Sequence, residues 1–171
     1  MTRRMVDSTN VHNIPLDVDI AGVYRNGSGA ADPAVVARRF PQDKYVTVWI
    51  DVLGTAADSC QIVDVEPGNV RAEHAPRWIK ARRAAVHTSL PTVYCDRTRH
   101  PEVVQACEAE GLKAGQHYQF WIATLDGSTK MNGVELDTIP GVVAVQVEGG
   151  QSAAFDRSVV YNDRWHPSPQ P

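Results

Sequence analysis

Short apolar segments bounded by turn residues recur along the whole chain. We expect eight of them to be buried strands, because they are rich in β-branched and aromatic residues. They cover residues 4–7, 20–24, 45–51, 61–66, 92–95, 118–124, 142–147 and 157–161. Most are continuously apolar rather than alternating, which is typical of a parallel sheet covered by helices on its outer face.

Three segments between these strands have helix signals. Asp32-Pro33 precedes a predicted helix at 34–40, with an N-capping carboxylate and a proline in the first turn. Ala75-Pro76 and His100-Pro101 likewise place a proline before predicted helices at 77–87 and 102–110. Strands interleaved with helices indicate an α/β fold.

The element order favours a small or irregular (β/α)8 TIM-like barrel, since eight strands are expected. With 171 residues the chain is shorter than the roughly 200–250 residues usual for that fold. An open, doubly wound sheet is the competing architecture. We expect one domain over 1–164, followed by a Pro-rich C-terminal tail at 165–171.

Polar residues gather where the predicted strands end. Asp7, Asp51, Tyr94 and Gln146 lie in or directly after the apolar runs, and Asp64 and Glu66 end the fourth run. In a parallel barrel the carboxyl ends of the strands meet at one mouth, where catalytic groups collect. These side chains are therefore expected to converge although they are far apart in the sequence.

Asp64 and Glu66 form the most informative pair. Residues two apart in a strand face the same way, with Cα atoms roughly 6.5 Å apart. Two neighbouring carboxylates repel each other, so the pKa of one rises and that group can donate a proton near neutral pH. Glycosidic bond cleavage needs such an acid and a charged carboxylate. The alternative is that this Asp-x-Glu caps a loop or forms a surface salt bridge.

Aromatic residues near the strand ends offer ring faces on which sugars pack. They are Tyr24, Trp49, Tyr94 and Trp121. Packing in the hydrophobic core is the alternative for each of them.

Composition excludes several other functions. The formal net charge of -3 argues against a nucleic-acid partner, which would require clustered Lys and Arg. No apolar run is long enough for a membrane span, and Asp7 interrupts any signal-peptide core. The three cysteines match no metal or redox motif and are expected to be reduced and buried. The histidines form no metal-binding pattern, and no cofactor motif is present.

The ordered motifs resemble family-25 glycoside hydrolases, and more closely the small glycoside-hydrolase-like proteins of actinobacteria and their phages. The motifs lie at 5–9, 63–68, 92–95, 145–146 and 155–160. The resemblance implies a compact β/α barrel that acts on peptidoglycan as a muramidase. It implies Glu66 as proton donor, Asp64 as its charge partner, Asp7 as the first-strand acid and Asp156 as a late-barrel acid.

Two hypotheses follow. The first is a lysozyme-like hydrolase of bacterial cell-wall glycan without cofactor or metal, with Glu66, Asp64 and Asp7 as catalytic residues. The candidate substrate-binding residues are Asp156, Gln146, Tyr94, Asp51, Trp121 and Tyr24. The second is a non-catalytic barrel that binds glycan or associates with virion proteins. Either protein is expected to be made in the cytoplasm without a signal peptide and to act at the cell wall or in a phage particle.

Overall fold

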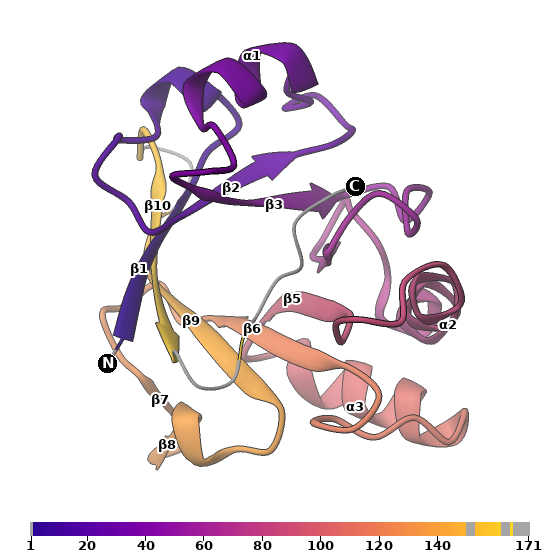
Figure 1. Cartoon of the computed structure of the whole chain (residues 1–171). Helices are drawn as coiled ribbons and strands as arrows, with labels where there is room; N and C mark the ends of the chain where they lie inside the picture. The colour runs from indigo at the N-terminus through magenta and orange to yellow at the C-terminus, as the bar shows by residue number, and fades with distance from the viewer. Residues whose placement is uncertain (1, 150–152, 162–164, 166–171) are drawn as a thin grey trace.

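Eight strands close into a barrel in the computed structural model, which describes residues 2–149, 153–161 and 165 (Figure 1). Around the barrel the order is β1, β10, β9, β6, β5, β4, β3 and β2. Their bounds are β1 (Thr2–Asp7), β2 (Ile20–Tyr24), β3 (Val46–Asp51), β4 (Ile62–Val65), β5 (Thr92–Asp96), β6 (Gln119–Ala123), β9 (Val142–Glu148) and β10 (Asp156–Tyr161). A small irregular TIM-like α/β barrel is thus confirmed, and the open sheet is wrong.

Strand β10 departs from the expected parallel arrangement. The other seven strands run parallel to one another, whereas β10 is antiparallel to both of its neighbours, β9 and β1. Only residues 149–155 connect β9 to β10. A parallel return needs about a dozen residues or more, so this connection allows only an antiparallel strand. As a result β10 begins at the barrel end where the other strands finish.

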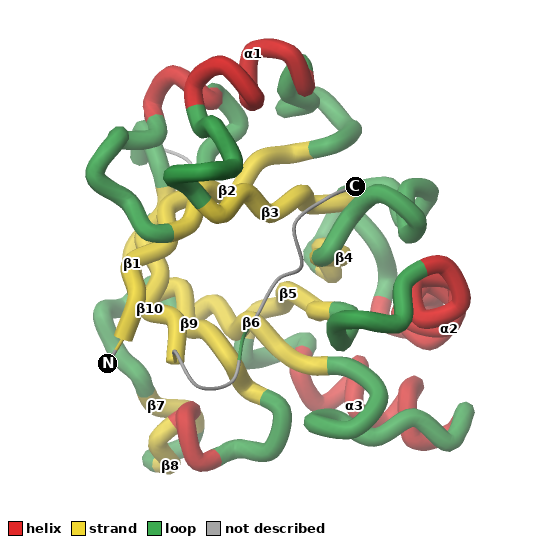
Figure 2. Tube along the Cα trace, in the orientation of Figure 1, coloured by secondary structure: helices red, strands yellow, loops and turns green. Residues whose placement is uncertain are grey.

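The described part of the chain has three α-helices, and they lie outside the ring of strands (Figure 2). They are α1 (Pro33–Arg39), α2 (Ala75–Ala85) and α3 (His100–Ala109), which confirms the three predicted helices within two residues at each end. Asp32 caps α1, because its Oδ1 accepts a hydrogen bond of 2.8 Å from the backbone N–H of Ala34.

The sequence analysis did not predict several short elements. They are the 3-10 turns η1 (Val11–Asn13), η2 (Ala72–His74) and η3 (Leu136–Thr138) and the hairpin of β7 (Lys130–Met131) and β8 (Val134–Glu135). Each spans only two or three residues, too few to show a periodic pattern. No α-helix lies between β3 and β4, where a loop at 52–61 connects the strands.

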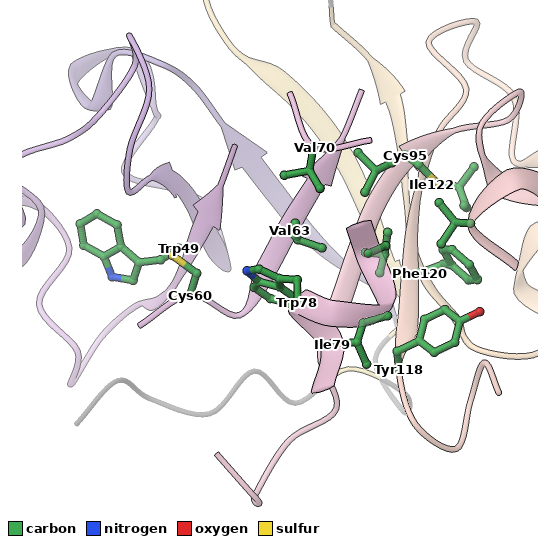
Figure 3. Packing of buried hydrophobic residues seen from close by; sticks show 14 of the residues in the cluster. Trp49, Cys60, Val63, Val70, Trp78, Ile79, Cys95, Tyr118, Phe120 and Ile122 are labelled. Carbon is green, nitrogen blue, oxygen red and sulfur yellow. The ribbon is translucent and has the colours of Figure 1, made fainter. Parts of the chain in front are cut away.

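Successive side chains of each barrel strand point alternately outward and inward, which produces two hydrophobic clusters. Outward-facing residues such as Val63 and Phe120 belong to one cluster with Trp78 and Ile79 of α2 (Figure 3). Inward-facing residues fill the barrel and include Met5, Ile20, Ile62, Trp121 and Val160. Cys60, Cys95 and Cys107 are free and buried, as predicted. Burial of both strand faces explains why the strand sequences are continuously apolar.

Trp165 belongs to the barrel interior. Its side chain is buried in the inner cluster, and its carbonyl accepts a hydrogen bond of 2.6 Å from Arg3 Nη2. The rest of the predicted tail, 166–171, lies outside the described residues. Among the residues described, no helix has the length and apolar character needed to cross a membrane.

Candidate active site

Four carboxylates from distant parts of the sequence lie at one end of the barrel. Asp7 ends β1, Asp64 lies in β4, and Glu66 follows that strand directly. Asp156 begins the reversed strand β10 and is the register partner of Asp7. The reversal of β10 therefore explains how a residue that precedes its strand joins residues that end theirs. We call this end of the barrel the mouth.

Asp7 is the most deeply buried of these acids, with 1% of its surface exposed. Glycine at position 22 makes room for it, because a Cβ on Gly22 would lie 2.6 Å from the Asp7 Cβ. Burial raises the pKa of Asp7 well above its usual value, and the charge of Asp156 raises it further. A hydrogen bond of 3.1 Å donated by Tyr24 Oη opposes this rise only in part.

Asp64 and Glu66 are coupled neighbours with different burial. Asp64 is 3% exposed, and burial together with the charge of Glu66 raises its pKa to about 7, against a hydrogen bond from Asn69. Burial also raises the pKa of the half-buried Glu66, while a hydrogen bond from Tyr94 lowers it. The pair therefore retains a proton near neutral pH, which an isolated pair of carboxylates in water does not.

Three buried oxygens at the mouth accept no hydrogen bond within the described part of the chain. They are Asp7 Oδ1, Asp64 Oδ1 and Gln146 Oε1. Buried acceptors without a partner are rare in folded proteins, since they lose hydration without compensation. Their concentration at one place indicates a site arranged for a ligand rather than for stability.

Gln146 lies beside Asp156. A Cβ on Gly149 would lie 2.2 Å from Asp156 Oδ1 and 2.8 Å from Gln146 Nε2, so both side chains border the same glycine. Gln146 is buried in β9, the strand next to β10. The structure thus brings both predicted substrate-binding residues to the mouth.

Tyr24 and Tyr94 supply phenol groups to the same carboxylates. Tyr24 donates to Asp7, and Tyr94 forms a hydrogen bond with Glu66. Burial and the neighbouring carboxylates raise the pKa of both phenols well above the usual value. Both hydroxyls therefore stay protonated and act as hydrogen-bond donors.

Trp121 does not reach the surface of the mouth, which corrects its prediction as a sugar-stacking residue. It is 1% exposed, its Nε1 donates a hydrogen bond of 3.0 Å to Ser158 Oγ, and its ring lies 4.6 Å from that of Tyr94. Trp49 lies in the outer cluster with the guanidinium of Arg25 over its ring. Core packing, the alternative considered above, accounts for both tryptophans.

Asp51 is also placed away from the other acids, which corrects its prediction as a substrate-binding residue. Ile50 faces the barrel interior, so Asp51 faces outward with no exposed surface. Its carboxylate accepts hydrogen bonds of 2.7 Å from Gly54 N, 2.7 Å from Ala56 N and 2.8 Å from Trp78 Nε1. Burial favours the neutral form, but hydrogen bonds led by that from Asn26 outweigh it and lower the pKa of Asp51. Asp51 therefore holds the loop after β3.

Asp96 is a site residue that the sequence analysis missed. It ends β5, one register step beyond the pair Val65 and Cys95, which places it beside Glu66. Its charge contributes to the raised pKa of Glu66. The strand-end rule that singled out Asp7 applies equally to Asp96, because Asp96 follows an apolar run directly.

No group of three or more His, Cys, Asp or Glu side chains within 2–149 and 153–161 is arranged to hold a metal ion. The mouth presents carboxyl groups, two phenols and an amide.

Comparison with known proteins shows a similar fold in one solved structure. No family model and no curated protein sequence matches the chain. A solved structure of a virulence factor of Streptococcus pneumoniae, described as a glycosyl hydrolase 25 participating in host cell invasion, superposes with a TM-score of 0.51 and 13% identity. The match covers 94% of this chain and 87% of that protein. At this identity the comparison establishes a shared fold, that of a family-25 glycoside hydrolase.

Proposed function

We propose that this protein is a glycoside hydrolase that cleaves a β-1,4 bond in bacterial cell-wall glycan, with muramidase-like chemistry. The observation that carries the proposal is the convergence of Asp7, Asp64, Glu66 and Asp156 at one barrel mouth. The raised pKa values of the first three add support, because acid catalysis at neutral pH requires a carboxyl group that keeps its proton. The fold shared with a glycosyl hydrolase 25 is consistent with this chemistry.

Glu66 is the proton donor in this proposal. It is half-buried whereas Asp64 is buried, so the proton held by the pair reaches a ligand from Glu66. Glu66 transfers that proton to the glycosidic oxygen while the bond from the anomeric carbon to that oxygen breaks. The leaving sugar departs as an alcohol, and Glu66 becomes a carboxylate.

Asp64 then faces the positive charge that develops at the anomeric carbon. In the reactive state the proton of the pair is on Glu66 and Asp64 is ionised. The Asp64 carboxylate then stabilises the oxocarbenium-like centre, or accepts a hydrogen bond from the N-acetyl group that assists there. A water molecule adds to the anomeric carbon and returns one proton to Glu66, which completes the cycle. Asp7 and Asp156, with Tyr24 donating to Asp7, orient the water and the acids.

Digestion of purified cell wall tests this function. The release of new reducing ends and the identity of the muropeptides are measured for the wild type, Glu66→Gln, Asp64→Asn and the control Glu108→Gln. Glu108 is exposed on α3. We expect Glu66→Gln to lose more than about 100-fold in rate, since a general acid contributes 10²–10⁴-fold. A wild type no faster than Glu66→Gln between pH 4 and 8 overturns the proposal.

A non-catalytic glycan-binding barrel, including one that is part of a phage particle, is the second candidate. The burial of Asp7 and Asp64 favours it, because a catalytic carboxylate must reach the substrate. This candidate predicts that cell-wall glycan co-sediments equally with the wild type and Glu66→Gln and that neither releases reducing ends.

A further inference from the structure

A cavity of about 680 Å³ lies beside the mouth, between the loop after β3 and the start of α2. Its lining comes from three segments, within 53–57, 69–74 and 77–81. We call it the basic groove, for the charge described next. The function proposed above does not use it.

Of the residues that the structure describes, three basic ones and no acidic one line this groove. Arg71, His74 and Arg77 are exposed there. Two exposed carboxylates flank the groove without lining it: Asp58 follows Ala57, and Glu73 forms an ion pair of 3.3 Å with Arg71. Among the residues that the structure describes, His74 and Arg77 are the basic lining residues without such an ion pair. Positive charge is thus concentrated beside an acidic mouth, on a chain whose net charge is -3.

The basic groove adjoins the candidate catalytic pair directly. Asn69, a lining residue, forms a side-chain hydrogen bond with Asp64. The backbone N–H of Val70, also a lining residue, donates a hydrogen bond of 3.2 Å to the Asp64 carbonyl oxygen. A ligand that occupies the mouth therefore needs only one short branch to reach the groove.

The walls of the groove are formed in advance. Asp51 fixes the loop through the backbone N–H groups of Gly54 and Ala56. Gly54 packs tightly against the opposite wall, because a Cβ there would lie 3.0 Å from Val70 Cγ2. Leu53 is 58% exposed, so one wall also offers an apolar contact. A preformed groove binds a ligand without the entropy cost of ordering its loops.

We propose that the basic groove binds the short, carboxylate-bearing peptide branch of cell-wall glycan while the sugar chain lies in the mouth. This inference rests on the proposed function, and it names the peptide-substituted strand as the substrate. The carboxylates at the mouth repel an anionic branch, whereas Arg71 and Arg77 attract it. Leu53 contacts the aliphatic side chains of the branch.

Hydrolysis of two matched substrates tests the proposal. Intact cell-wall glycan and the same glycan stripped of peptides by an amidase are digested by the wild type, Arg71→Gln, Arg77→Gln and the control Arg38→Gln. Arg38 is exposed on α1, outside the groove. We expect each groove variant to raise KM about two- to fivefold on the intact glycan only, as the loss of one exposed charge contact does. Equal KM changes on both substrates overturn the proposal.

Binding of free peptide separates this proposal from the hydrolytic one. A synthetic stem tetrapeptide, its C-terminal amide and a polyglycerol phosphate are each titrated into the full-length protein. Binding of each ligand is measured by NMR. We expect the tetrapeptide to bind most tightly, to weaken with salt and to lose its binding in the Arg71→Gln/Arg77→Gln double variant. Peptide binding without hydrolysis of any substrate supports the groove and rejects the hydrolase. Tighter binding of the phosphate polymer, or peptide binding that is unchanged in the double variant, rejects the groove.

Discussion

At the scale of single residues, the candidate site consists of carboxyl groups held where their charge is unfavourable. Asp7 and Asp64 are buried, and one oxygen of each accepts no hydrogen bond from the described residues. Burial penalises the charged form, so these groups lower the free energy of unfolding when they ionise. Such a cost is typical of residues retained for function rather than for stability.

Stability should therefore depend on pH through Asp64. Its pKa is raised to about 7, so between pH 4 and 7 the folded state binds more protons than the unfolded state, and stability falls as pH rises through that window. Asparagine does not ionise. We compare the free energy of unfolding of Asp64→Asn with that of the wild type. We expect the difference in favour of the variant to increase by about 2–4 kcal/mol from pH 4.5 to pH 8.

Urea denaturation at the two pH values measures this difference. The exposed Glu108→Gln serves as the control, because burial and the charge of Glu66, not that of Glu108, raise the pKa of Asp64. An Asp64→Asn advantage that is the same at both pH values would show that Asp64 keeps its charge in the folded state.

Asp96 and Tyr94 should shift the pKa of Glu66 in opposite directions. Asp96 raises it through its charge, and Tyr94 lowers it through a hydrogen bond. We expect the pKa of Glu66 to fall in Asp96→Asn and to rise in Tyr94→Phe, with activity at pH 8 about two- to fivefold below the wild type in the former. The titration is followed by ¹³C NMR of the Glu66 carboxyl group, which needs no turnover.

The Asp96→Asn variant removes the charge of Asp96 without removing the hydrogen bond that Asp96 accepts. Asp96 Oδ1 accepts a hydrogen bond of 2.7 Å from the Arg99 N–H at the start of α3, and an asparagine oxygen accepts the same bond. A Glu66 pKa that moves the same way in both variants is incompatible with the opposed roles of the two residues.

At the scale of elements, the reversed strand β10 completes the site. Its first residue, Asp156, pairs in register with the last residue of β1, Asp7. The connection through Gly149 sets how closely Asp156 and Gln146 approach each other, because both side chains border that glycine.

A side chain at position 149 should disrupt the site more than the fold. Gly149 has φ +153°, and a Cβ would lie 2.2 Å from Asp156 Oδ1. We expect Gly149→Ala to lower the free energy of unfolding by about 1–3 kcal/mol. We also expect it to lower activity more than tenfold, because it displaces Asp156 and Gln146. The matched control is Gly133→Ala in the turn between β7 and β8, where φ is +79° and no atom lies within 4 Å of the added Cβ.

Thermal unfolding and wall digestion together separate the two glycine variants. Equal stability losses with activity lost only in Gly149→Ala support the steric explanation. Equal activity losses in both variants would point to backbone strain instead.

At the scale of the whole molecule, stability depends on closing the barrel. β10 pairs with both β1 and β9, and the Trp121 side chain bonds to Ser158 of β10 from inside. Without β10 two strand edges and the inner cluster are exposed, which favours aggregation. Closure thus joins the first and last strands of the barrel. The contacts between β1 and β10 form only after the whole chain is available.

Truncation tests this dependence. We expect a chain that ends at Gly149 to lose its cooperative unfolding transition and its near-UV circular dichroism and to elute as aggregates. A chain that ends at Trp165 keeps β10 and the buried indole and is the control. A monomeric 1–149 fragment that unfolds cooperatively would mean that the remaining strands form a stable open sheet.

Local sequence patterns predict much of this fold. Short β-branched runs bounded by turns mark all eight barrel strands, and the Pro-containing starts mark the three α-helices. Both signals act within a few residues, so they are readable without tertiary contacts. The same rule of polar residues at strand ends locates Asp7, Asp64 and Glu66, and applied fully it includes Asp96.

Tertiary structure alone decides which way each strand runs and on which face a side chain lies. Asp51 and Asp64 both lie near the end of an apolar run, yet Asp51 faces α2 and Asp64 faces the mouth, because a one-residue difference in phase reverses the face. Asp156 precedes its strand and still reaches the mouth, since β10 is antiparallel. The sequence determines the elements and the chemistry they carry, whereas barrel closure determines which carboxylates meet, because it joins residues 7 and 156 through pairing that no local pattern encodes.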